Sequence, residues 1–150
     1  MPRPSIIPLL LVLSGSMPTA MGNTELAGVD NEHRARVNYQ LACQGCHGPS
    51  GEGMTHGDVP SMRGFVGNFL KVAGGRDFLV QVPGSANAAL DDAQLAEVLN
   101  WILGTMSAQQ LPPDFQPYTA GEITSLRSTP IEDLDATRAR LVDALPTPTP

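Results

Sequence analysis

The stretch Cys43-Gln44-Gly45-Cys46-His47 constrains the fold more than any other part of this 150-residue chain. It contains both cysteines of the sequence and one of its three histidines. A Cys-x-x-Cys pair can form a disulfide, one corner of a zinc site, a redox-active dithiol or an attachment site for c-type haem. These four alternatives require different surroundings, so the rest of the sequence can be used to separate them.

Three of the alternatives fit the surrounding sequence poorly. A structural zinc site needs about four ligands, and the only histidines besides His47 are His33 and His56. A thioredoxin-like dithiol belongs to a βαβ unit, whereas this motif follows a helix-forming segment without any parallel-sheet pattern around it. A disulfide between Cys43 and Cys46 would close a very short loop and would constrain the unfolded chain little.

The fourth alternative uses all three side chains of the motif. In Cys-x-x-Cys-His, each thiol forms a thioether with one vinyl group of haem, and the adjacent imidazole ligates the iron. We therefore predict one covalently attached haem c, with Cys43 and Cys46 as the attachment residues and His47 as the iron ligand.

The first 22 residues have the features of a secretory signal peptide. Arg3 precedes an apolar stretch at residues 6–13 that is too short to span a bilayer, and small residues follow it. An uncleaved N-terminal anchor is the alternative. Removal of residues 1–22 takes away one positive charge, so the formal net charge changes from −6 to −7. Because c-type haem is attached after export, we expect a periplasmic protein without a membrane span.

The charge pattern bears on possible partners. The chain has no run of Lys or Arg and is acidic overall, which argues against nucleic-acid binding, since that depends on neutralising phosphates. An acidic surface suits a protein partner with a basic docking patch.

The periodicity predicts an all-α fold. Residues 31–43 and the segment that Asp91 opens have helical patterns, the latter stopping near Gly104. Residues 68–72 suit a short helix, residues 76–82 are ambiguous between strand and helix, and residues 48–68 form a Gly-rich loop.

The composition changes after residue 106, which suggests a haem domain at residues 23–106 and a helical extension at residues 107–145. Thr119 and Thr129 each begin a Thr-x-x-Glu capping box. The second box should open an amphipathic helix, with Ile131, Leu134, Leu141, Val142 and Leu145 on one face. Residues 146–150 are expected to be a disordered tail.

The chain up to about residue 104 resembles the class I cytochrome c family, which contains a single haem. The resemblance is carried by the haem motif, by Tyr39 and Ala35 four and eight residues before Cys43, and by Trp101 in the last helix of the haem domain. It implies a cytochrome c-like haem domain in which the helix of Tyr39 crosses that of Trp101.

The stretch from Pro60 to Asn68 is similar to a second motif of that family. By resemblance, the Pro60 carbonyl accepts a hydrogen bond from the free ring nitrogen of His47, and Met62 packs on the same haem face as His47. Asn68 stands where many relatives have an arginine that holds a haem propionate, a role that Arg63 or Arg76 could take.

The resemblance fails at the second axial ligand. The family usually places a methionine shortly before the last haem-domain helix, but residues 81–92 contain no Met, His or Lys. The remaining candidates are Met54, His56, Lys71 and Met106, or no ligand from the chain at all.

These observations lead to one functional prediction and two alternatives. The prediction is an exported, non-enzymatic cytochrome that carries single electrons between periplasmic redox partners. One alternative is a haem protein with an open or weakly ligated sixth iron position, suited to ligand binding or peroxidase-like chemistry. The other is a cytochrome subunit of a periplasmic dehydrogenase, with the extension as the docking segment.

Overall fold

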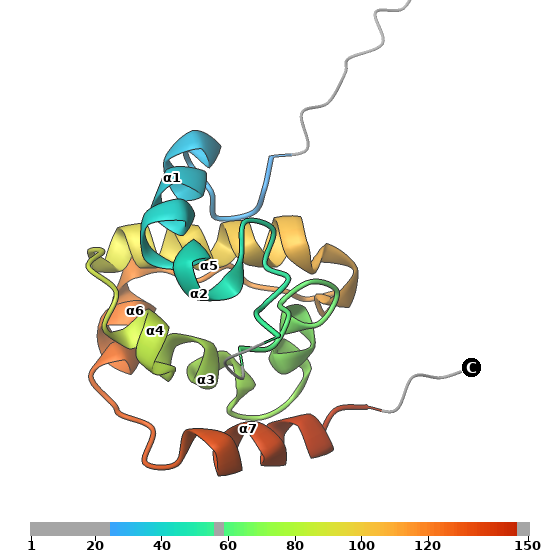
Figure 1. Ribbon diagram of the computed structural model, residues 1–150. Coiled ribbons are helices and arrows are strands. Elements are labelled where there is room, and N and C mark those ends of the chain that lie inside the picture. Colours follow the sequence, from blue (N-terminus) through green and yellow to red (C-terminus); the bar gives the residue numbers. More distant parts are fainter. Residues whose placement is uncertain (1–24, 56–58, 147–150) are drawn as a thin grey trace, which may run out of the picture.

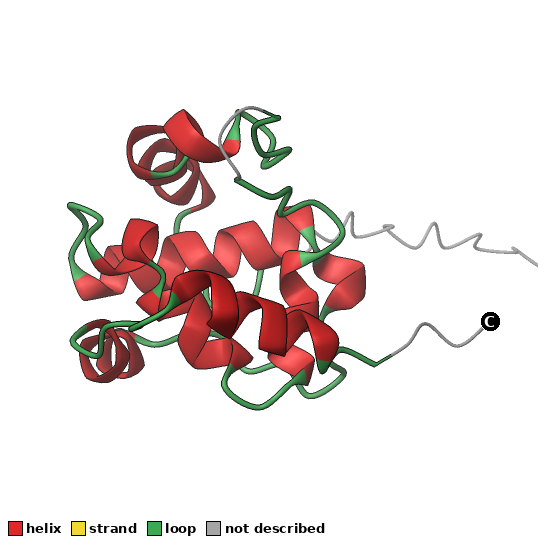
Figure 2. Ribbon diagram, turned by 60° about the horizontal axis from the view of Figure 1, so that its bottom comes forward, coloured by secondary structure: helices red, strands yellow, loops and turns green. Residues whose placement is uncertain are grey.

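The computed structural model describes residues 25–55 and 59–146, and their regular structure is helical (Figures 1 and 2). The predicted signal peptide, His56 and all but the first residue of the predicted tail lie outside the described residues. The elements are α1 (Glu32–Ala42), α2 (Gln44–His47), η1 (Val66–Lys71), α3 (Gly75–Gln81), α4 (Pro83–Ala86), α5 (Asp92–Met106), η2 (Ala108–Gln110), α6 (Ala120–Arg127) and α7 (Leu134–Asp143). Within this part of the chain the only β pairing is an isolated bridge between Met54 and Val59. The predicted all-α fold is confirmed.

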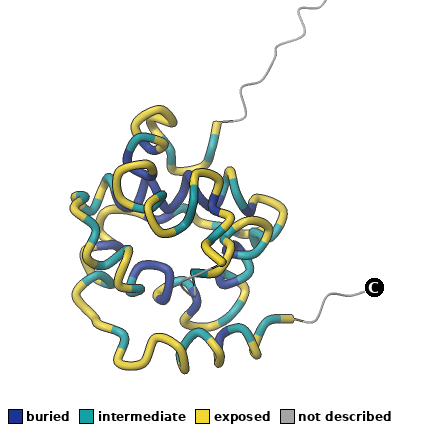
Figure 3. The backbone as a smooth tube through the Cα atoms, in the orientation of Figure 1, coloured by how far each residue is buried: buried dark blue, intermediate teal, exposed yellow. Residues whose placement is uncertain are grey.

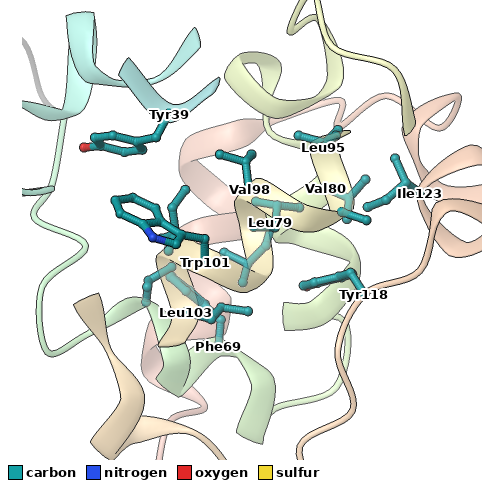
Figure 4. Packing of buried hydrophobic residues seen from close by; sticks show 14 of the residues in the cluster. Tyr39, Phe69, Leu79, Val80, Leu95, Val98, Trp101, Leu103, Tyr118 and Ile123 are labelled. Carbon is teal, nitrogen blue, oxygen red and sulfur yellow. The ribbon is translucent and has the colours of Figure 1, made fainter. Parts of the chain in front are cut away.

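The crossing of α1 and α5 forms the centre of the core. Asn31 caps α1 by accepting a hydrogen bond from the backbone N–H of Arg34. The rings of Tyr39 and Trp101 lie 5.4 Å apart and are tilted by 45°, and Ala35 is completely buried. Figure 4 shows Tyr39 against Trp101 at one end of the buried cluster. The predicted helix crossing is therefore confirmed.

Helix α5 begins where the sequence predicted and ends later. Asp91 and Gln94 form a reciprocal capping box at its N-terminus. The helix continues through Gly104 to Met106, so the predicted stop at Gly104 is wrong. Gly104 has a packing role instead, because a Cβ at this position would lie 2.9 Å from Cδ2 of Leu26.

The segment between the Gly-rich loop and α5 is also helical. The predicted short helix is the 3₁₀ helix η1, and the ambiguous residues 76–82 form most of α3. A Cβ at Gly75 would collide with the carbonyl oxygen of Phe69, which explains why a glycine links the two helices. The rings of Phe69 and Phe78 lie 5.2 Å apart and join η1 to α3.

Residues 107–146 pack against the rest of the chain. Tyr118, Ile123 and Leu141 belong to the same buried cluster as Tyr39 and Trp101, and Figure 3 colours the chain by the burial of each residue. Helix α6 contacts α5 and α3. Two ion pairs cross the boundary, Arg76 with Glu122 and Arg127 with Asp92.

A buried amide ties three segments together. The side chain of Asn100 donates to the carbonyl oxygens of Gly28 and Tyr118, both at 3.0 Å, and accepts from the N–H of Tyr118 at 2.8 Å. Asn100 is 1% exposed. It therefore links the N-terminal segment and the extension to the middle of α5.

The start of α7 differs from the prediction. The helix begins at Leu134, with Asp133 accepting a hydrogen bond from the N–H of Ala136, so the capping box predicted at Thr129 is wrong. The carboxylate of Asp133 caps the helix about one turn further into the predicted segment. Leu141 is buried on the face that points to the core, whereas Leu134 is 38% exposed.

We expect Glu97→Gln to lower the free energy of unfolding by about 2 kcal/mol at neutral pH, since each hydrogen bond to a charged group contributes about 1.5–3 kcal/mol. The buried carboxylate accepts from the N–H groups of Asp30 and Asn31 and from the guanidinium of Arg34. The Arg34 hydrogen bond is the main reason that the pKa of Glu97 is lowered.

The sign of the pH effect follows from that lowered pKa. The contribution of Glu97 is complete above the ordinary carboxyl pKa and disappears as the pH falls through the lowered folded-state value. Urea unfolding from neutral to acid pH should therefore show a steeper loss of stability in the native chain than in Glu97→Gln. Parallel curves for the two proteins would contradict this role of Glu97.

Candidate haem-binding site

The haem motif occupies one helical turn directly after α1. Cys43 ends α1 and caps α2, and its carbonyl oxygen accepts hydrogen bonds from the N–H groups of Cys46 at 3.2 Å and His47 at 3.0 Å. Residues three and four positions apart lie on the same face of a helix. The backbone therefore presents both thiols and the imidazole on one side.

Tyr39 attaches this turn to the core. Its ring packs on Trp101, and its hydroxyl donates a 2.5 Å hydrogen bond to the carbonyl oxygen of Gly48. Gly48 has φ of +79° and ends α2, a conformation that favours glycine. The Tyr39 side chain thus joins the C-terminal end of the motif turn to the α1–α5 crossing.

The two cysteines have different environments. Both are free thiols; Cys43 is partly buried and Cys46 is exposed. Burial, with a smaller contribution from the neighbouring Cys46, raises the pKa of Cys43 to about 11. Cys43 is therefore a neutral thiol at physiological pH.

The His47 ring is suited to metal ligation. Burial lowers its pKa, which favours the neutral imidazole that binds metals. Its Nδ1 atom is buried and makes no hydrogen bond. A buried ring nitrogen without a partner is uncommon in proteins and calls for a reason in function or binding.

The hydrogen bond expected between His47 and the Pro60 carbonyl is not formed in the structure. The loop returns on itself through the Met54–Val59 bridge, and the Pro60 peptide packs on Gly53, where a Cβ would lie 2.8 Å from the Pro60 carbonyl carbon. The role of Pro60 at the haem stays a prediction.

Met62 and Met106 lie together beside the motif loop. The N–H of Met62 donates to the carbonyl oxygen of Gly51 at 2.8 Å. A Cβ at Gly51 would collide with the sulfur of Met106 and would lie 3.3 Å from Cε of Met62. Met106, one of the candidate second ligands, therefore shares the side of the site predicted for Met62.

The other candidate ligands are placed as follows. Met54 is 47% exposed in the loop after the motif. Lys71 is exposed, and its Nζ donates to Oδ1 of Asn68 at 3.0 Å. His56 lies outside the described residues.

Two curated proteins give significant matches to this chain. A cytochrome c-552 of Thermus thermophilus is 31% identical over 126 residues, which cover 72% of this chain and 81% of the relative. A second cytochrome c-552 of the same species is 32% identical over 104 residues, covering 57% of this chain and 79% of the relative. The chain belongs to the class I cytochrome c family. No family model and no solved structure matches it.

The residues of this cytochrome c fit the haem that the family implies. Two free thiols and the His47 imidazole, whose pKa is lowered by burial, lie on one helical face. Three buried side-chain nitrogens in the described chain have no hydrogen-bond partner, and they are His47 Nδ1, Asn38 Nδ2 and Trp101 Nε1. All three belong to the motif or to the two helices that cross behind it. No helix of the described residues is long and apolar enough to cross a membrane.

The arginines considered for a haem propionate differ in availability. Arg76 pairs with Glu122, donates to the carbonyl oxygen of Gln116 at 2.7 Å and lies 4.1 Å from the ring centre of Tyr118. These contacts engage Arg76 with the extension, whereas Arg63 is exposed. Arg63 is therefore the better candidate of the two.

Sequence reasoning missed the roles of Asn38 and Arg127. Asn38 on α1 is 7% exposed. The only sequence indication of its burial was its helical spacing from the buried Ala35. Arg127 of α6 donates to the carbonyl oxygens of Ala86, Ala88 and Leu90. Only the folded structure brings this arginine to the α4–α5 connection.

Proposed function

We propose that this cytochrome c carries single electrons through one haem c bound by Cys43, Cys46 and His47. The observation that supports the proposal most strongly is the His47 ring, whose Nδ1 atom is buried without a hydrogen-bond partner, on the same helical face as two free thiols. The similarity to proteins named cytochrome c-552 supports it independently.

Each residue of the site has a defined task in this proposal. Haem would supply a redox-active iron when bound. Cys43 and Cys46 would hold the group in place, and His47 would provide a nitrogen ligand to its iron. Met62 contributes an apolar surface beside His47, and the carbonyl of Pro60 is the acceptor that would orient the His47 ring. The exposed position of Cys46 gives that edge of the group access to solvent and partners.

The cellular setting belongs to the same proposal. Residues 1–22 direct export, and the protein works in the periplasm without a membrane span. The extension uses Ile123, Leu141 and Tyr118 to complete the core that it shares with α1 and α5. That packing supports a separate carrier over a dehydrogenase subunit held by its extension.

The acidic surface sets the kind of redox partner. The whole chain has a formal net charge of −6, and signal cleavage removes the positive charge of Arg3, which gives −7. The protein should therefore dock a partner with a basic patch. The oxidised protein should therefore accept electrons faster from a reduced cationic metal complex than from an anionic one of similar potential, and added salt should reduce the difference. Equal rates at low salt would contradict electrostatic docking.

A spectroelectrochemical titration tests the carrier function. We expect the visible haem bands to follow one reversible Nernst curve with a single electron and full recovery after several cycles. A protein that loses its bands on cycling, or that titrates with two electrons, would contradict the proposal.

A further inference from the structure

The segment that contains the haem motif carries no acidic or basic side chain apart from His47. Residues 37–51 include no Asp, Glu, Lys or Arg, although the whole chain has 15 acidic and 9 basic residues. Arg36 directly precedes this segment, and Glu52 directly follows it. A charge that reaches the motif from either end would therefore act on a group bound there without an opposing charge from the segment itself.

Of these two flanking charges, Glu52 is the one that turns toward the motif. The guanidinium of Arg36 lies 3.3 Å from Nδ1 of His33, about one helical turn further from the motif. The Glu52 carboxylate lies beside Gly48, the residue that follows His47. A Cβ at Gly48 would lie 2.5 Å from Cδ of Glu52 and 2.8 Å from each of its carboxylate oxygens. The missing side chain of Gly48 therefore leaves the space that this carboxylate fills.

Two backbone hydrogen bonds define where Glu52 lies relative to the motif. Its Oε2 atom accepts from the N–H of Ser50 at 2.8 Å. The N–H of the next residue, Gly53, donates to the carbonyl oxygen of His47 at 2.8 Å. Because one bond fixes the carboxylate and the other ties the loop to the iron ligand, the negative charge has a defined place beside the motif.

The Tyr39 hydroxyl gives independent evidence of this proximity. It donates a hydrogen bond to the carbonyl oxygen of Gly48, so it meets the motif at the same residue as the carboxylate. The pKa of Tyr39 is raised chiefly by burial, and Cys43 and the Glu52 carboxylate raise it further. The charge of Glu52 therefore acts on a side chain that holds the motif in place.

The Glu52 carboxylate does not belong to any ion pair of the described residues. The three ion pairs in that part of the chain use Glu97, Glu122 and Asp92. Glu52 is exposed, so water and salt screen its charge, but no described Lys or Arg neutralises it.

We propose that the Glu52 carboxylate is a fixed negative charge beside the motif that lowers the reduction potential of the iron that His47 would hold. The ferric state carries one more positive charge than the ferrous state, so a nearby carboxylate stabilises the ferric state more. This inference rests on the proposed function, because it concerns the haem attached at the motif.

The reduction potentials of the haem-loaded protein and its variants test this role. Glu52→Gln keeps the length of the side chain and an oxygen that can accept from Ser50, so it removes little besides the charge. At low salt we expect the equilibrium constant for reduction to rise about threefold, as for one solvent-screened charge. At about 59 mV per tenfold change for one electron, this is about 28 mV. Glu52→Asp keeps the charge and should stay close to the wild-type potential.

Asp135→Asn is the matched control. It also removes one exposed acidic charge, but its helix α7 lies on the far side of α3 from the motif helix α2 (Figure 1). Its potential should equal that of the wild-type protein. Added salt should reduce the effect of Glu52→Gln, because salt screens an exposed charge.

Three results would overturn the inference. The first is an equal potential in the wild-type protein and Glu52→Gln, and the second is an equal shift in Asp135→Asn, which would make net charge the cause. The third is a shift accompanied by a changed ferric spectrum, which would mean altered iron ligation. If Glu52→Gln fails to load haem, Glu52→Ala gives the same comparison. A wild-type protein without a one-electron curve would contradict the carrier function instead, so the two failures are distinguishable.

Discussion

A chain in which Cys43 and Cys46 are both replaced by serine should lack haem and most of its helix. The motif helix α2 has no buried residue, so its packing must come from the group that it binds. Far-UV circular dichroism of the purified variant measures the effect.

Gln44→Ala is the control for this experiment. Gln44 lies between the two cysteines and sets their spacing without contributing a thiol, so this variant should keep haem and native helicity. A double-serine variant with the helicity of the wild-type protein would contradict the claim that haem completes the core.

A chain that ends at Met106 should not form a stable haem domain. It lacks Tyr118, Ile123 and Leu141, each at most 3% exposed, and the loss of one such side chain typically costs about 2–5 kcal/mol. It also leaves the buried Asn100 without its hydrogen bonds to Tyr118. The sum is comparable to the whole stability of an ordinary domain, about 5–15 kcal/mol.

A chain that ends at Thr129 is the matched comparison. It keeps α6, Asn100 with its partners and the contacts of Arg127, and it loses the buried Leu141. We expect it to bind haem and to melt at a lower temperature than the full chain. If the chain ending at Met106 melts at the same temperature as the full chain, residues 107–150 are a separate appendage.

Features that depend on neighbouring residues could be predicted from the sequence. The motif spacing and the Asn31 and Asp91 helix starts follow from local patterns, whereas the Tyr39–Trp101 contact was expected from the resemblance to the class I cytochrome c family. The start of α7 was mistaken because two capping signals compete within a few residues, and Asp133 caps the helix. Gly104 was mistaken for a stop because its contact with Leu26 is remote in sequence.

Features that depend on distant segments could not be predicted. Arg127 meets the α4–α5 connection about 40 residues away in the chain, and no periodicity signals such a contact. Asn38 occupies a helical position where an apolar residue would be expected, and only the folded structure shows that its amide nitrogen is buried without a partner. The sequence therefore located the haem motif and left these distant contacts undefined.

Covalent haem attachment is the central claim, and the intact mass of the denatured protein tests it most directly. The protein should be produced in a bacterium with c-type haem maturation and analysed after acid and solvent extraction of loose haem. We expect the mass of the chain without residues 1–22 plus one haem, and a pyridine haemochrome band typical of two thioether bonds. A mass equal to the chain alone would contradict the claim.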